Sequence, residues 1–237
     1  MSTSLLKSLR QQLPTLSSQE RRPLFLLLAA STLVAVHRPF GSIEFARSVI
    51  GIHGDPYPSI YMFLTAFLLF GLVPFVLIVL SKGSPAECGV QLGDWKFGLK
   101  AVAILLPLIV VLFLIPASHD SQIRHTYPLD PSVGSSLWQF LVFQSLRGLL
   151  YYGAWEFFFR GVMLFGLEDR FGRWAAIAIQ TIPSSLWHIG FPTGELITSI
   201  PGGILFGLLA FRTRSILWPF LLHFMIAVIL DLLIIFS

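Results

Sequence analysis

The sequence predicts an all-α membrane protein: one polytopic transmembrane helical bundle of about seven spans, within a range of six to eight. Only 12% of the 237 residues are charged and 55% are hydrophobic, whereas soluble domains carry about 25% charged residues. The mean hydropathy is +0.78. The apolar residues also gather into runs of roughly the 20 residues that a helix needs to cross a bilayer.

The expected elements follow one another with short polar loops between them. We expect a cytoplasmic N-terminal tail over 1–22 and a single transmembrane bundle over 23–237, with a catalytic-type core at 136–237. The expected spans are 23–37 (a short one), 58–81, 98–117, 136–166, 173–189, 195–211 and 215–236. Pro74 should kink the second span, and Pro183 should interrupt the fifth.

The N-terminal segment and the basic residues predict how the chain enters the membrane. The first 22 residues lack an apolar core, so we expect no cleavable signal peptide. With the N-terminus inside, the inner segments hold Lys7, Arg10, Arg21, Arg22, Lys82, Lys96, Lys100, Arg170, Arg173, Arg212 and Arg214, and the outer loops hold Arg38, Arg47 and Arg124. This excess of basic residues on one side follows the positive-inside rule.

Several classes of chemistry are disfavoured by composition and motif. The single cysteine, Cys88, excludes an intramolecular disulfide and a cysteine zinc cage. Basic residues are scattered through the loops, so no nucleic-acid partner is expected. The chain has neither His-Glu-x-x-His nor Gly-x-Ser-x-Gly. We therefore expect no metal and no cofactor.

A carboxylate and a guanidinium stand together in an aromatic run. Glu156 and Arg160 lie four residues apart within 151–161, so on a helix they share one face. An ionisable residue at bilayer depth costs several kcal/mol unless it is paired or faces a polar cavity. One interpretation is a structural ion pair that joins two helices. The other is a functional site.

Other polar residues lie in the apolar helices of the second half: His188, Glu195, His223 and Asp231. A carboxylate and two imidazoles on separate helices are sufficient for general acid–base catalysis on a water molecule. Each residue also has a plainer interpretation. Either histidine could be a packed side chain, and Glu195 could be a first-turn acid favoured by the helix dipole. Asp231 could simply reach the interface.

Three motifs in this order resemble the CAAX-protease and bacteriocin-processing family of intramembrane glutamic endopeptidases. The segment 155–161, Trp-Glu-Phe-Phe-Phe-Arg-Gly, is similar to the family's Glu-Glu-x-x-x-Arg motif. The segment 184–188 is similar to the second motif, which ends in a histidine. His223, in a helix that follows a glycine-rich one and a short basic turn, resembles the third. The resemblance covers roughly residues 85–231.

The resemblance implies an intramembrane endopeptidase that hydrolyses a peptide bond near the membrane in a protein or peptide substrate. It implies that Glu156 activates water, His188 assists and His223 stabilises the oxyanion. Supporting roles are expected for Arg160, Glu195 and Asp231. It also implies an integral, multi-pass protein of a prokaryotic inner membrane, without a prediction of the oligomeric state.

The chain departs from the family pattern at three positions. Trp155 replaces the first glutamate, Ser184 replaces a phenylalanine, and Ala227 replaces the asparagine or aspartate four residues after His223. These departures motivate the alternative of a non-catalytic membrane scaffold that binds a partner protein. A transporter is disfavoured because the two halves share no pair of broken helices. The helix positions of the polar residues predict a site reached from the outer half of the membrane.

Overall fold

The structure is a computed structural model that describes residues 17–237, except for the side chains of residues 18 and 19. Within this part of the chain the regular elements are helices, and no strand occurs. Five helices are long and apolar enough to cross a membrane: Glu20–Phe40, Tyr57–Leu80, Trp95–Ser118, Thr193–Thr213 and Leu217–Ile235. The all-α membrane fold is confirmed, while the count of about seven spans stays a prediction. The expected tail lies, over residues 1–16, outside the described residues.

The elements alternate between α-helices and short π or 3-10 turns. In chain order the α-helices are α2 (Ser18–Phe40), α3 (Ile43–Phe45), α4 (Tyr57–Ala66), α5 (Val73–Leu80), α6 (Trp95–Ile109), α7 (Ile115–Ser118), α8 (Ser121–Thr126), α9 (Leu137–Leu146), α10 (Gly153–Glu156), α11 (Leu164–Leu186), α12 (Thr193–Thr213) and α13 (Leu217–Ile235). The π-helical turns are η1 (Ala46–Ile50), η2 (Phe67–Leu72), η4 (Val110–Leu114), η6 (Arg147–Tyr152) and η7 (Phe157–Met163), and the 3-10 turns are η3 (Pro85–Cys88) and η5 (Pro131–Ser135).

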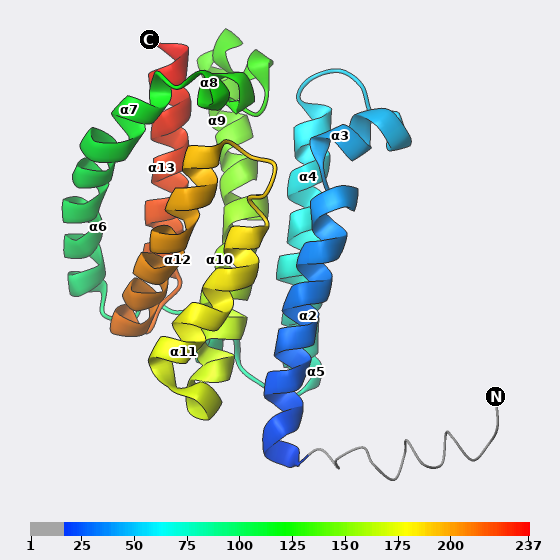
Figure 1. The fold of residues 1–237 in the computed structure, drawn as a ribbon, viewed down its shortest axis with the longest axis vertical. Helices are drawn as coiled ribbons and strands as arrows, with labels where there is room; N and C mark the ends of the chain where they lie inside the picture. The colour runs from blue at the N-terminus through cyan, green and yellow to red at the C-terminus, as the bar shows by residue number, and fades with distance from the viewer. Residues whose placement is uncertain (1–16) are drawn as a thin grey trace, which may run out of the picture.

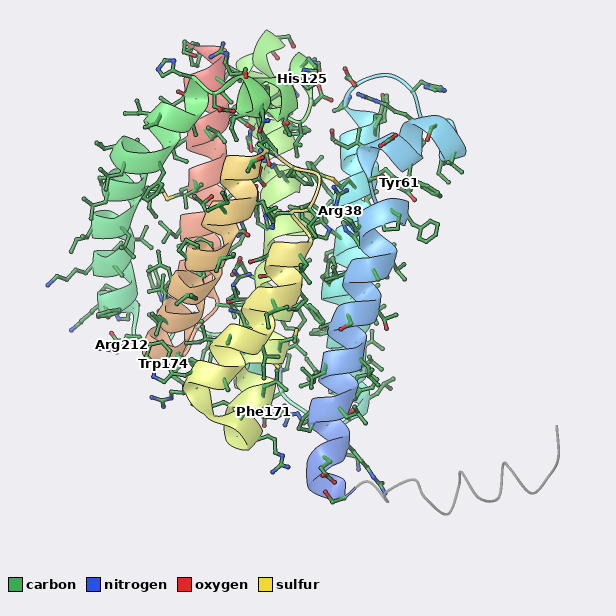
Figure 2. All side chains as sticks on the ribbon, in the orientation of Figure 1. Arg38, Tyr61, His125, Phe171, Trp174 and Arg212 are labelled. Atoms are coloured by element: carbon green, nitrogen blue, oxygen red, sulfur yellow. The ribbon has the colours of Figure 1, made fainter. Side chains whose placement is uncertain are left out.

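The helices run along one long axis in three groups (Figure 1). The helices α2, α4 and α5 lie on one side, α6, α12 and α13 on the other, and the segment from α9 to α11 passes between them. Because this central segment packs against both groups, its side chains form most of the main hydrophobic core. Arg212 and Trp174 lie at one end of the bundle and His125 at the other (Figure 2).

The first helix of the described residues begins earlier than predicted. Helix α2 starts at Ser18, so the residues up to 22 that we expected in the tail form its first turn. A capping box explains the difference, because the Ser17 backbone N–H donates to Glu20 Oε2 over 3.0 Å. The apolar run 23–37 is therefore part of a longer helix, and its span is long enough to cross a bilayer.

The helical segment from Leu137 to the break at Gly172, which we call the central helix, extends beyond the predicted span 136–166. Helical structure runs from Leu137 through η6, α10 and η7 into α11. It is interrupted at Gly172, where φ is 76° and ψ is 167°. That conformation favours glycine, because a Cβ atom is strongly disfavoured at positive φ. The rest of α11, up to Leu186, then runs back through the bundle and covers most of the expected fifth span. The predicted interruption at Pro183 is wrong, because the helix continues through this residue.

Small residues allow α11 and α12 to pack closely. A Cβ atom on Gly203 would lie 2.8 Å from Thr181 Cγ2, and one on Gly207 would lie 3.1 Å from Ile177 Cγ1. The Gln180 side chain also donates to the Gly203 carbonyl over 3.0 Å. This contact matters for the site because α11 leads into His188 and α12 begins next to Glu195.

We predict that Gly203→Ala lowers the thermal unfolding midpoint in detergent, because the added methyl group overpacks the contact with Thr181 at a cost of about 1–3 kcal/mol. Gly202→Ala is the matched control, since a Cβ atom there meets nothing within 4 Å. The control should be neutral or slightly stabilising, because alanine favours the helix. Equal midpoints for the two variants would contradict close packing at Gly203.

Candidate active site

Glu156 is fully buried at the centre of the bundle and contacts two partners. Its Oε1 lies 2.7 Å from His223 Nδ1, and its Oε2 lies 3.3 Å from Arg160 Nε. The second contact is the pair that the i,i+4 spacing predicts. The first contact joins the central helix to α13. Glu156 therefore lies between a guanidinium and an imidazole, without solvent exposure.

His223 uses one ring nitrogen to contact this carboxylate. Nδ1 donates to Glu156, because an ionised carboxylate only accepts. The ring packs between Tyr152 and Phe206, at centroid distances of 4.5 and 5.1 Å. Among residues 17–237 no hydrogen bond to the other nitrogen, Nε2, is formed. The side chain is 21% exposed, so Nε2 is the nitrogen left for a ligand.

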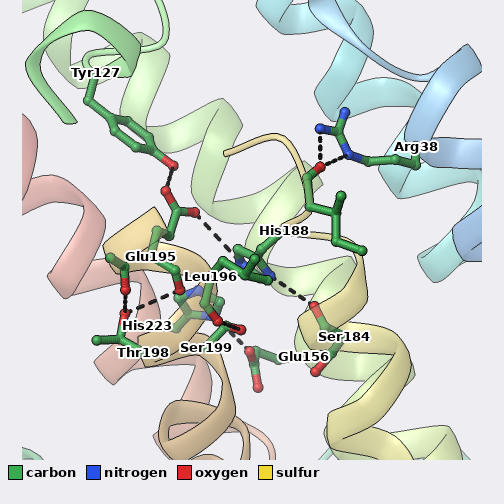
Figure 3. A network of polar contacts seen from close by, with 12 residues as sticks. Arg38, Tyr127, Glu156, Ser184, His188, Glu195, Leu196, Thr198, Ser199 and His223 are labelled. Carbon is green, nitrogen blue, oxygen red and sulfur yellow. Dashed lines mark hydrogen bonds and ion pairs between the residues drawn. The ribbon is translucent and has the colours of Figure 1, made fainter. Parts of the chain in front are cut away.

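His188 is fixed by a backbone carbonyl in the turn that follows α11. Its Nδ1 lies 2.9 Å from the Ser184 carbonyl oxygen, which can only accept. Nδ1 is therefore protonated, and in the neutral ring Nε2 carries the free lone pair. His188 Nε2 lies 3.6 Å from Glu195 Oε1. Figure 3 shows this His188–Glu195 contact and the Glu156–His223 contact in one polar network.

The turn that carries His188 is held from the other side of the bundle by α2. The Arg38 guanidinium donates to the Ile189 carbonyl, over 3.0 Å from Nε and 2.5 Å from Nη2. It also lies 5.6 Å from the Trp187 ring centroid. One residue earlier, His37 Nδ1 accepts the indole N–H of Trp187 over 3.1 Å. The end of α2 thus holds the two chain neighbours of His188, Trp187 and Ile189.

The two histidines line one small internal cavity. Its walls are formed by Met62, Tyr127, Leu129, Arg147, Tyr151, Tyr152, Trp155, Trp187, His188, Phe191, Glu195 and His223. The cavity volume is about 30 Å³, and a polar cavity of this size can hold a water molecule. Glu156 is not part of the wall and reaches the cavity only through His223.

Glu195 is the carboxylate in this wall. It lies in the first turn of α12, and its side chain is 24% exposed. Its Oε2 accepts the Tyr127 hydroxyl over 2.9 Å. Burial raises the pKa of Tyr127 well above its ordinary value, so the hydroxyl stays protonated and donates. The hydroxyl holds Oε2 at the cavity, while Oε1 lies 3.6 Å from His188 Nε2.

Trp155 occupies the position of the missing first glutamate. Its ring is 2% exposed and packs against Phe159 at 4.5 Å, Trp187 at 5.2 Å and Phe70 at 5.4 Å, measured between centroids. Trp155 also lines the cavity, with its ring centroid 6.3 Å from that of His188. The central helix therefore presents an indole to the cavity.

Asp231 belongs to a separate buried network and does not contact His223. Asp231 Oδ2 accepts from Arg147 Nη1 over 2.8 Å and from Gln144 Nε2 over 2.6 Å. The Arg147 guanidinium also lies 5.3 Å from the Tyr152 ring centroid. This ion pair joins the central helix to α13, and its Arg147 side chain lines the cavity.

Sequence reasoning missed three contributions to the site. Tyr127 was expected in a polar loop, and Arg38 in an outer loop, although each holds a site residue. Gln144 was not considered. Arg38 had a usable signal, since it stands at the end of an apolar helix where an unpaired cation has few partners. Tyr127 and Gln144 offered no signal at the sequence level, because their partners lie 68 and 87 residues away.

The fold and the site define a class: a multi-pass membrane protein in which imidazoles and a carboxylate surround an internal cavity. Residues 134–229 match the family model described as type II CAAX prenyl endopeptidase Rce1-like. This match agrees with the resemblance of the three motifs to the CAAX-protease family, which is a family of proteases. No match to the chain was found among curated proteins or among solved structures. Among the described residues, no group of three or more histidine, cysteine, aspartate or glutamate side chains could hold a metal ion.

We predict that Asp231→Asn destabilises the protein by about 3–5 kcal/mol, because it leaves the Arg147 charge buried without its counter-ion. The thermal unfolding midpoint in detergent measures the effect. Asp55→Asn is the matched control: it breaks an exposed pair with Arg47 and should cost no more than about 1 kcal/mol. A loss for Asp231→Asn as small as for the control would contradict a buried, ionised pair.

Proposed function

We propose that the protein is an intramembrane endopeptidase of the glutamic type, which hydrolyses a peptide bond with water held in the cavity between His188 and His223. The observation that carries the proposal is the pairing of these imidazoles. They come from segments 35 residues apart (223 − 188), each has its Nδ1 fixed by an acceptor, and both line one cavity. The match to an endopeptidase family supports the same reaction.

In this proposal His223 stabilises the oxyanion. With Nδ1 bound to Glu156, the ring nitrogen left for a substrate is Nε2, which donates a hydrogen bond when the ring carries its second proton. A donor aimed at the developing oxyanion is worth about 2.7–4 kcal/mol of barrier. Glu156, which is expected from the family pattern to activate water, acts here as a positioning residue for His223. Arg160 holds the second oxygen of the same carboxylate.

His188 assists the attacking water. Because the Ser184 carbonyl binds its Nδ1–H, the Nε2 lone pair is available to accept a hydrogen bond from water. General acid–base catalysis of this kind contributes about 10²–10⁴-fold to a rate. Aromatic rings form part of the cavity wall, and an environment that excludes bulk water strengthens the electrostatic contacts inside it.

The substrate we propose is a membrane-associated protein or peptide whose scissile bond enters the cavity from the outer half of a prokaryotic inner membrane. The basic residues place the end with Arg212 in the cytoplasm under the positive-inside rule. Arg38, which holds the His188 turn, lies away from that end (Figure 2). Glu195 lies at the start of α12, at the opposite end of that helix from Arg212.

The alternative is a non-catalytic scaffold of the same fold. Trp155 and Ala227 favour it, because each puts an apolar side chain where the family pattern has a polar one, and each is packed in the hydrophobic core. A scaffold would keep its cellular function when Glu156, His188 and His223 are replaced.

We predict that His188→Ala and His223→Ala each lower kcat at least about 100-fold, since each removes a group that contacts the reacting atoms. The assay uses the purified full chain in lipid nanodiscs with two quenched-fluorescence probes: a prenylated peptide with a CAAX carboxyl terminus, and an unmodified peptide with one apolar helix. Glu156→Gln should lower kcat more than it changes KM, because it acts through His223.

The matched controls for this assay are His53→Ala and Glu44→Gln, which change exposed side chains of the same types. Both should cleave at the wild-type rate. Full activity in His188→Ala and His223→Ala would reject the proposed function and favour the scaffold.

We predict that a cysteine at Gly194 is labelled by a membrane-impermeant maleimide from outside intact cells, whereas one at Asp169 is labelled only after lysis. Both positions are exposed, and a Cβ atom at Gly194 meets nothing within 4 Å. The background is Cys88→Ser, which removes the buried native thiol. Labelling of Gly194→Cys only after lysis would show that the site opens to the cytoplasm.

A further inference from the structure

The cavity contains a carboxylate that the family motifs do not assign. Glu156 has no solvent exposure, and both of its oxygens face other side chains, His223 and Arg160. Glu195 comes from a different helix, has its side chain 24% exposed and lines the cavity. Of the two glutamates near the histidines, Glu195 is the one that a water molecule in the cavity can touch.

The contact between Glu195 and His188 requires a donor between them. His188 Nε2 carries a lone pair because its Nδ1–H is bound to the Ser184 carbonyl. Glu195 Oε1, at 3.6 Å from Nε2, is also an acceptor when the carboxylate is ionised. Two acceptors do not hydrogen-bond to each other, and 3.6 Å is too long for a shared proton. A water molecule that donates one hydrogen to each satisfies both.

Such a water molecule is oriented for attack. With both hydrogens donated, its lone pairs are directed away from Glu195 and His188 and toward the rest of the cavity. His223 lies in the wall of the same cavity, where its Nε2 can bind the carbonyl oxygen of a peptide. The Tyr127 hydroxyl fixes the other oxygen of Glu195, and the start of α12 stabilises its negative charge.

We propose, on the basis of the proposed function, that Glu195 is the catalytic base of this protein. It takes the role of the first glutamate of the family motif, at whose position this chain has Trp155. Glu195 removes one proton from the water as the water oxygen bonds to the scissile carbonyl carbon. The oxygen of that carbonyl becomes the oxyanion at His223. When the C–N bond breaks, the proton passes from Glu195 to the leaving amine. The products are a new carboxyl terminus and a new amino terminus, and no oxidant, reductant or metal is consumed.

The position of Trp155 is consistent with a catalytic base that comes from α12 and not from the central helix. Its ring centroid is 6.3 Å from that of His188, so the indole fills the side of the cavity next to His188. The carboxylate instead approaches His188 from α12, seven residues further along the chain (195 − 188). The central helix supplies only the positioning carboxylate, Glu156.

The test compares Glu195→Gln with Glu195→Asp in the full chain in nanodiscs, with the two quenched-fluorescence probes described above. Glutamine keeps the size and can still accept from Tyr127 but is not a base, so kcat should fall at least about 100-fold with KM within about threefold. Aspartate keeps the carboxylate but is one methylene group shorter. Glu195→Asp should therefore retain more activity than Glu195→Gln. Glu44→Gln is the control.

A second measurement separates a base from a structural side chain. Sodium formate should restore part of the activity of Glu195→Ala, because the small carboxylate can enter the space that the side chain leaves. A structural role would leave the variant inactive with formate. Wild-type kcat in Glu195→Gln, with His188→Ala and His223→Ala inactive, would overturn this inference alone. Wild-type kcat in all of them would overturn the proposed function as well.

Discussion

The structure depends on the pairing of charge inside an apolar bundle. A charged side chain at bilayer depth is costly unless it is paired. The buried charged residues of the central helix, Arg147, Glu156 and Arg160, are each paired with a residue of the same helix or of α13. Arg147 binds Asp231, and Glu156 binds Arg160 and His223. These contacts fix the rotation and the depth of the central helix relative to α13. His223 and Arg147, which take part in these contacts, also line the cavity.

The two histidine rings are each oriented by a hydrogen bond at Nδ1, but the acceptors of these bonds differ. Each has its Nδ1 bound to an acceptor, a carbonyl for His188 and a carboxylate for His223, so in each ring Nε2 is the nitrogen left for the cavity. The acceptors differ in charge, and in the proposed mechanism this difference gives the two rings different roles. The neutral carbonyl leaves His188 as an acceptor toward water, whereas the Glu156 carboxylate is a counter-ion for His223 when the ring is doubly protonated. The same residue type can thus serve opposite ends of one reaction.

Local patterns in the sequence predicted the all-α membrane fold and one of the contacts in the candidate site. Hydrophobic runs located the last two helices to within about two residues, and the i,i+4 spacing predicted the Glu156–Arg160 pair. The start of α2 was missed because a capping box, not hydrophobicity, determines it. The contacts of Glu195 with Tyr127 and of Arg38 with Ile189 join residues 68 and 151 positions apart. No local pattern encodes such contacts. The motif order therefore suggested Glu156 as the base, whereas its contact with His223 favours a role in positioning that ring.

The most direct measurement is a structure of the protein with a bound peptide in which a hydroxyethylene group replaces the scissile amide. We expect the hydroxyl to lie in the cavity between the two rings. It should be at hydrogen-bond distance, about 2.6–3.2 Å, from Glu195 or His188 Nε2 and near His223 Nε2, while Glu156 keeps its contact with His223. A hydroxyl bound outside the cavity would contradict the proposed mechanism, and so would a Glu156 side chain that leaves His223 to bind the hydroxyl itself.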